Sequence, residues 1–129
     1  MRRADAGIAT IWTAVVAVAC LSMAGLVMDG GRILRARSSS YDLAGGAARV
    51  ATQELNEVAL NRGDVLVDVE AATDSALAWL AERNAGGSVV VEGDTVTVTV
   101  VQQVDMQFLP LASVEVSETA TAQARRGGT

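Results

Sequence analysis

The side chains that could carry catalysis are few, and they are poorly placed for it. Glu54 and Glu57 lie three residues apart, a spacing that sets two carboxylates on one face of a helix, where acid–base catalysis could use them. The serine run at 38–40 has no histidine anywhere in the chain to activate a hydroxyl group. Two carboxylates on a solvated helix are usually ordinary surface charge. We therefore expect a protein that is not an enzyme.

Metal and nucleic-acid chemistry are also disfavoured by the composition. The chain of 129 residues has one cysteine and no histidine, so the usual zinc ligand sets cannot be assembled. Its net charge is -5, and its ten basic residues, all arginines, form no cluster that would bind phosphates. We expect no metal, no cofactor and no nucleic-acid partner.

The single cysteine, Cys20, allows two interpretations. With Ala17, Val18 and Ala19 before it, it loosely resembles the lipobox of bacterial lipoproteins, in which small residues precede a modifiable thiol. A lipoprotein would usually turn polar after the cysteine, whereas residues 21–28 stay apolar. The other interpretation is a thiol that behaves as a small hydrophobic side chain inside a helix. The first interpretation leaves a membrane-tethered or lipoprotein-like ligand-binding module as the alternative function.

An uncharged stretch near the N-terminus is long enough to cross a membrane. Residues 6–28 carry no charged side chain. As a helix they would extend about 35 Å, and the hydrocarbon core of a bilayer measures about 30 Å. Arginines flank the stretch on both sides, so charge alone does not settle its orientation. We predict a short cytoplasmic lead at 1–7, a transmembrane helix at 8–28 and, because the remainder has a secreted-type pattern, an extracytoplasmic C-terminal part.

The first charged residue after this stretch is Asp29. It could form an ion pair with Arg32 or Arg35, which follow on the same predicted helix. It could equally mark the boundary with water, and we favour this second interpretation.

Two sets of small residues mark surfaces where another helix could approach closely. One set recurs at i, i+3 and i+7 in the predicted membrane helix and forms a smooth ridge. An ordinary alanine-rich helix is the other interpretation of that set. The second set lies beyond the membrane segment. The candidate helix-packing residues are Ala17, Cys20, Ala24, Gly45, Gly46 and Ala48.

Beyond the membrane segment, apolar residues first recur at helical spacing. They predict a helical extension over 29–60 and a second helix over 68–84, with Asp68 suited to its N-terminal turn. The glycine pairs at 30–31 and 45–46 are positions where the extension could kink, because each glycine costs up to about 1 kcal/mol relative to alanine.

From residue 88 the apolar period changes to two. Residues 89–91 and 96–100 predict a β-hairpin that turns at 92–94, and residues 114–121 allow a third strand. A loop is expected around Phe108, Leu109 and Pro110, since proline fits poorly inside a central strand.

These elements predict an α+β fold, in which a long N-terminal helix leads to a second helix and a small antiparallel sheet. The small extracytoplasmic α+β domain is expected at 61–124, followed by a flexible tail at 125–129. A soluble part this small favours help from a partner or from oligomerisation.

Four stretches of the chain occur in an order that suggests a family. Residues 5–12 (Asp-Ala-Gly-Ile-Ala-Thr-Ile-Trp) form a short charged lead and the opening of an apolar helix. Residues 25–32 (Gly-Leu-Val-Met-Asp-Gly-Gly-Arg) join that helix to an acid, glycines and an arginine. An alanine-rich stretch follows at 41–52, and residues 114–122 end in alternating serine, alanine and threonine. With these stretches the chain resembles the TadE/TadG-like pilus-assembly proteins of the tight-adherence (Flp) pilus system, in their divergent actinobacterial form.

The resemblance implies a pilin-like accessory component, or minor pilin, that is anchored in the cytoplasmic membrane. It would pack against other pilin-like subunits through its helix and take part in assembling an adhesive pilus or a related secretion apparatus. Pilin-like precursors are cut after a glycine, so the resemblance makes Gly7 and Ile8 the candidate processing site. Such precursors carry glutamate at the fifth mature position, where this chain has Trp12, a residue suited to an interfacial aromatic belt.

Overall fold

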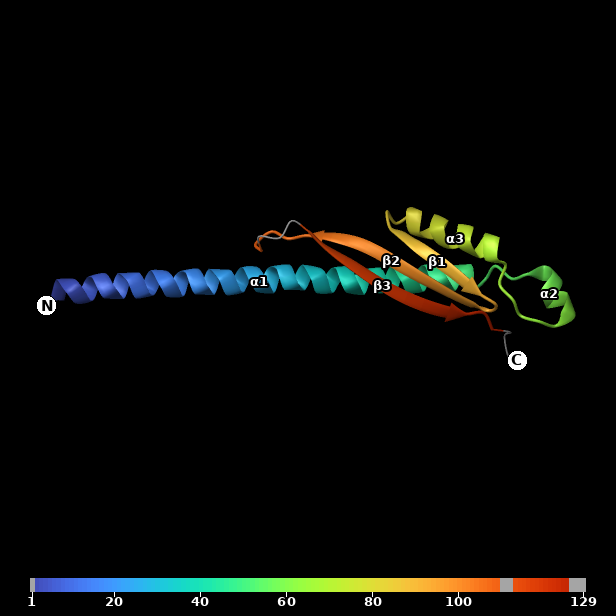
Figure 1. Ribbon diagram of the computed structural model, residues 1–129, viewed down its shortest axis with the longest axis horizontal. Coiled ribbons are helices and arrows are strands. Elements are labelled where there is room, and N and C mark those ends of the chain that lie inside the picture. Colours follow the sequence, from blue (N-terminus) through green and yellow to red (C-terminus); the bar gives the residue numbers. More distant parts are fainter. Residues whose placement is uncertain (1, 110–112, 126–129) are drawn as a thin grey trace.

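One long helix forms the spine of the molecule. The computed structural model describes residues 2–109 and 113–125. Helix α1 (Arg2–Ala51) is continuous from end to end. The sheet and α3 lie along its C-terminal half, and α2 lies beyond its C-terminal end (Figure 1). Both glycine pairs, at 30–31 and 45–46, lie in unbroken helix, so the interruptions considered there do not occur.

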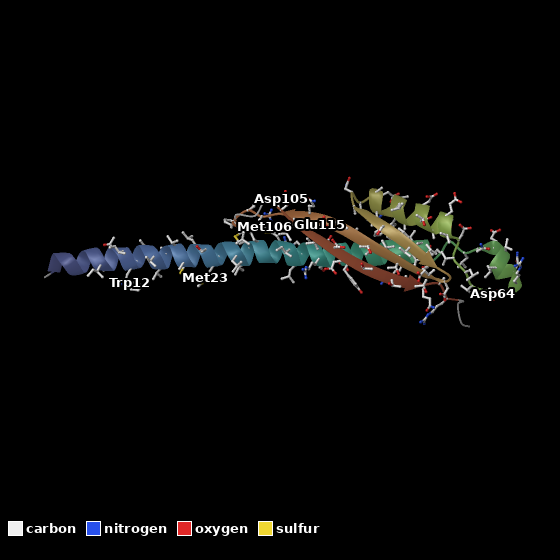
Figure 2. All side chains as sticks on the ribbon, in the orientation of Figure 1. Trp12, Met23, Asp64, Asp105, Met106 and Glu115 are labelled. Carbon is white, nitrogen blue, oxygen red and sulfur yellow. The ribbon has the colours of Figure 1, made fainter. Side chains whose placement is uncertain are left out.

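The N-terminal half of α1 is bare. Among the described residues, α1 is the one helix long and apolar enough to cross a membrane, and only 6% of its most apolar 18-residue window is buried. A core helix of similar composition would be mostly covered by protein. Figure 2 shows Trp12 and Met23 projecting from this bare part, where their side chains are 66% and 67% exposed. By length and composition, α1 could be a single membrane span.

Helix α1 ends nine residues earlier than the sequence predicted, at Ala51 rather than at residue 60. Residues 57–62 form a separate short helix, α2 (Glu57–Arg62). The side chain of Asn56 accepts a hydrogen bond from the Ala59 N–H at 3.0 Å, which makes Asn56 the N-cap of the new helix. A β-bridge between Leu55 and Val67 holds the preceding residues in an extended path. Together, the cap and the bridge prevent the continuation that periodicity alone suggested.

Helix α3 (Val69–Ala81) occupies the region of the second predicted helix. Asp68 is its N-cap, and its side chain accepts a hydrogen bond from the Ala71 N–H at 3.0 Å. The helix ends before Asn84, which has a left-handed φ of 55° and so cannot continue the helix. Its observed C-terminus is therefore three residues short of the predicted one.

The predicted hairpin and third strand are confirmed. The strands β1 (Gly86–Glu92), β2 (Thr95–Asp105) and β3 (Ser113–Gln123) form one antiparallel sheet in the order β1-β2-β3. The two-residue turn between β1 and β2 contains Gly93 at φ 64°, a conformation that favours glycine. The predicted α+β fold class is thus confirmed.

The core lies between the sheet and the two longer helices. Alternate residues of β2, namely Val96, Val98 and Val100, are fully buried, as expected for a strand with one covered face. They belong to a single apolar cluster with buried residues of both helices, namely the alanines Ala44, Ala47, Ala48, Ala51, Ala72 and Ala76 and the larger Leu80. Residues 44–51 of α1 are therefore part of the same packed unit as the domain predicted at 61–124. We call this unit the head.

Candidate functional site

The most organised polar contact in the described chain lies where the bare half of α1 meets the sheet. Asp29 is fully buried there, directly after the apolar segment. Its carboxylate accepts hydrogen bonds from three successive backbone N–H groups, those of Gln107 (3.1 Å), Phe108 (2.9 Å) and Leu109 (2.8 Å). These residues follow β2, whose last residue, Asp105, lies with Met106 at the end of the sheet nearest the bare helix (Figure 2). We call Asp29 and residues 107–109 the loop latch.

Two further contacts on α1 support the loop latch. The Arg32 guanidinium donates to the Asp105 carbonyl oxygen at 3.3 Å. On the other side of Asp29, Gly25 is buried under the loop, and a Cβ added to it would lie only 2.8 Å from Phe108 Cβ. Gly25, Asp29 and Arg32 are spaced at i, i+4 and i+7, so they share one side of the helix. One side of α1 thus lets the loop pack closely at Gly25 and presents a carboxylate and a guanidinium group to it.

The environment of Asp29 favours its charged form. Burial by itself raises the pKa of a carboxyl group, because it removes the charge from water. The hydrogen bonds from Leu109, Gln107 and Phe108 and the nearby charge of Arg32 act in the opposite direction, and the pKa of Asp29 lies below its ordinary value of 3.8. The carboxylate is therefore ionised at neutral pH, and it holds the loop with charge-assisted hydrogen bonds.

A methyl group at Gly25 should release the loop without harming the helix. Gly25→Ala places a Cβ against Phe108, while alanine itself favours helix by up to about 1 kcal/mol. We expect faster hydrogen exchange at the amides of residues 107–109 and unchanged helix content by circular dichroism. Gly30→Ala is the matched control, since no heavy atom lies within 4 Å of a Cβ added there. Equal exchange rates in the two variants would contradict the role of Gly25.

The candidate residues on the bare part of α1 are all exposed. This holds for the processing candidates Gly7 and Ile8 and for the ridge of Ala17, Cys20 and Ala24. Among the described residues, nothing outside the adjoining helix backbone lies within 4 Å of a Cβ added at Gly7. The head therefore leaves this whole stretch accessible to lipid or to another chain.

The other candidate packing residues contact elements of the same chain. Ala48 is fully buried in the core. A Cβ added at Gly46 would collide with the indole ring of Trp79 on α3, and one added at Gly45 would lie 4.0 Å from the Ala120 Cβ on β3. A helix does approach closely at this stretch, and it is α3 of the head.

The two glutamates considered for catalysis do not lie on a common helix. Glu54 lies in the connection after α1, where its carboxylate accepts a hydrogen bond from the Ser75 hydroxyl at 2.8 Å. Glu57 is the first residue of α2. The expectation that the two carboxylates share one helix face is therefore wrong, because Glu54 belongs to no helix and α2 begins only at Glu57. Within residues 2–109 and 113–125, no group of three or more histidine, cysteine, aspartate or glutamate side chains could hold a metal ion.

The sequence interpretation missed the loop latch. It offered Asp29 as an ion-pair partner or as a marker of the water boundary, whereas the structure places it under the β2–β3 connection, 78 to 80 residues away in the chain. The available signal was an acid four residues after a glycine at the end of an apolar run. Nothing in that pattern identifies which distant backbone the acid would bind.

No protein-family model, no curated protein and no solved structure matches this chain.

Proposed function

We propose that the chain is a membrane-anchored, pilin-like accessory component, or minor pilin, that takes part in assembling a tight-adherence type pilus or a related secretion apparatus. The observation that carries the proposal is that α1 has two structural roles. One unbroken helix is a bare apolar rod in its N-terminal half and the spine of an α+β head in its C-terminal half. The head would lie outside the cytoplasm, with the N-terminus inside.

The dimensions of the bare rod support this function. Residues 8–28 would extend about 32 Å as a helix, enough to cross a bilayer once. Its apolar side chains are exposed on every side, and among them Ile11, Val18 and Leu21 are 63–73% exposed. The same surface that faces lipid in the membrane could pack against helices of other subunits in an assembly.

The junction of rod and head also supports the proposal. The stretch 25–32, which resembles the corresponding junction of TadE/TadG-like proteins, contains Gly25, Asp29 and Arg32, the three residues that hold the loop to α1. The junction motif therefore has a physical role in this chain, which is to fix the head at the end of the apolar segment.

The proposal is tested by enlarging one side of the rod. In cells whose own copy is deleted, Ala24→Leu adds bulk to the ridge of small residues, and Ala19→Leu makes the same change on a different side of the helix. Both alanines are exposed, so neither substitution disturbs the head. We expect the yield of filaments sheared from the cell surface to fall several-fold with Ala24→Leu and to stay near normal with Ala19→Leu, at equal membrane levels of the two proteins.

Two outcomes would contradict the proposal. One is normal filament yield in cells that lack the chain altogether. The other is a lipid on Cys20, seen as a mass increase in the mature protein that disappears in Cys20→Ser. Such a lipid would support the alternative, a membrane-tethered or lipoprotein-like ligand-binding module.

A further inference from the structure

The loop latch lies beside the apolar segment rather than beyond it. Phe108 packs against Gly25, which is three residues inside the end of that segment at Met28. The groove between the loop and α1 extends further back, to Leu21 and Val18. If α1 crosses a bilayer, the loop must therefore reach the level at which lipid begins.

The side chains of the loop suit that level. Phe108 is 57% exposed even though it packs on Gly25. Leu109, the next residue, is partly exposed. Within the described residues, two neighbouring apolar side chains that follow β2 are thus left partly uncovered beside the apolar segment.

The backbone of the loop is prepared for an environment without water. Irregular backbone is rarely found in lipid, because each N–H group without a partner costs several kcal/mol there. Asp29 accepts hydrogen bonds from the N–H groups of Gln107, Phe108 and Leu109. The latch thus removes the main obstacle to placing this stretch at the membrane surface.

Charged residues lie on the correct side of the loop. A groove beside Phe108 is lined by Val27 and Met28 towards the apolar segment and by Arg32 and Arg35 towards the head. From the rod outwards, the surface therefore changes from apolar side chains to guanidinium groups. Lipid molecules present their acyl chains and phosphates in the same order, and guanidinium groups bind phosphates well.

We propose that residues 107–109, which follow β2, form a second membrane contact of this chain. Phe108 and Leu109 insert into the interface of the leaflet from which the head emerges, while Arg32 and Arg35 lie at the level of the lipid phosphates. This inference rests on the proposed membrane span of α1, and its occupant is the bilayer that surrounds α1 itself.

The composition of the chain allows a test without any substitution at the site. Phe108 is the only phenylalanine and Tyr41 the only tyrosine, so biosynthetic labelling with a fluorinated analogue of either gives a single ¹⁹F signal. Tyr41 is the matched control, because it is also 57% exposed but lies on α1 about 18 Å beyond Asp29. Fluorotryptophan at Trp12 reports separately on the rod, after assignment with Trp12→Leu.

The measurement is made on the full chain in phosphatidylcholine–phosphatidylglycerol nanodiscs. A nitroxide carried on lipid tails and a water-soluble gadolinium chelate are added in turn, and the relaxation of each ¹⁹F signal is recorded. We expect the ratio of the lipid-probe effect to the water-probe effect to be several-fold higher at Phe108 and at Trp12 than at Tyr41.

The three labels separate the two proposals. If Trp12 responds to the lipid probe while Phe108 gives the same ratio as Tyr41, insertion of the loop is wrong and the membrane span stands. If Trp12 responds mainly to the water probe, both the span and the insertion are wrong.

Discussion

Alanine at Gly46 is expected to destabilise the head, although alanine is the better helix former. The added Cβ would collide with the edge of the Trp79 indole ring, and the Arg83 guanidinium lies over a face of the same ring, 3.7 Å from its centroid. Movement of the ring away from Gly46 would disturb its contact with Arg83. It would also loosen the packing of α3 on α1. Overpacking of this kind typically lowers the free energy of unfolding by about 1–3 kcal/mol. Urea unfolding in detergent, followed by circular dichroism, measures the change.

Gly45→Ala is the matched control, with the opposite expected sign. Its Cβ would lie in ordinary contact with Ala120, at 4.0 Å, so only the gain in helix propensity is left, about 0.5–1 kcal/mol. The two substitutions differ by one position in the same helix. If both stabilise the protein, Trp79 does not pack on Gly46 as the structure has it.

Removal of the Asp29 carboxylate should free the β2–β3 connection. Asp29→Ala leaves three neighbouring N–H groups without their acceptor, and a buried donor that loses its partner is costly. We expect hydrogen exchange at the amides of residues 107–109 to accelerate on the order of tenfold or more. Asp29→Asn should have an intermediate effect, because its amide keeps one acceptor oxygen and places an NH₂ group against the remaining donors.

Asp42→Ala is the control for this prediction, since Asp42 is an exposed acid on the same helix. It should leave the exchange rates at 107–109 unchanged.

The effect of pH on the contribution of Asp29 to stability has a defined sign. Because the pKa of Asp29 is lower in the folded protein, its stabilising contribution is complete above its ordinary pKa and is lost as the pH falls through the folded value. Protection that persists at the same level in Asp29→Ala would rule out the loop latch.

Much of the fold could be predicted from local patterns. The alternation of Val96, Val98 and Val100 with threonines identifies a strand with one buried face, and Gly93 after Glu92 identifies its turn. Asp68 was likewise predicted at the start of the second helix, although in its first turn rather than as the N-cap that it is. The end of α1 was not, because helical periodicity continues past Ala51 and the competing contact, the bridge between Leu55 and Val67, joins residues twelve positions apart.

The candidate site was less accessible to prediction. Gly46 was recognised as a position of close approach, but its partner, Trp79, is 33 residues further along the chain. Asp29 was recognised as a boundary, but its three hydrogen-bond donors are backbone groups, which every residue except proline possesses. A sequence pattern identifies side chains that have unusual chemistry. It does not identify which ordinary backbone they will meet after the chain has folded.

The unbroken course of α1 has a mechanical consequence. Because no hinge interrupts the helix between rod and head, a tilt or rotation of the rod is passed directly to the head. The contact of Asp29 with residues 107–109 limits independent movement at the junction. Membrane helices tilt when the surrounding bilayer becomes thinner. If α1 crosses a bilayer as proposed, such a tilt would incline the head by the same angle, so the thickness of the membrane would set the orientation of the sheet relative to the membrane surface.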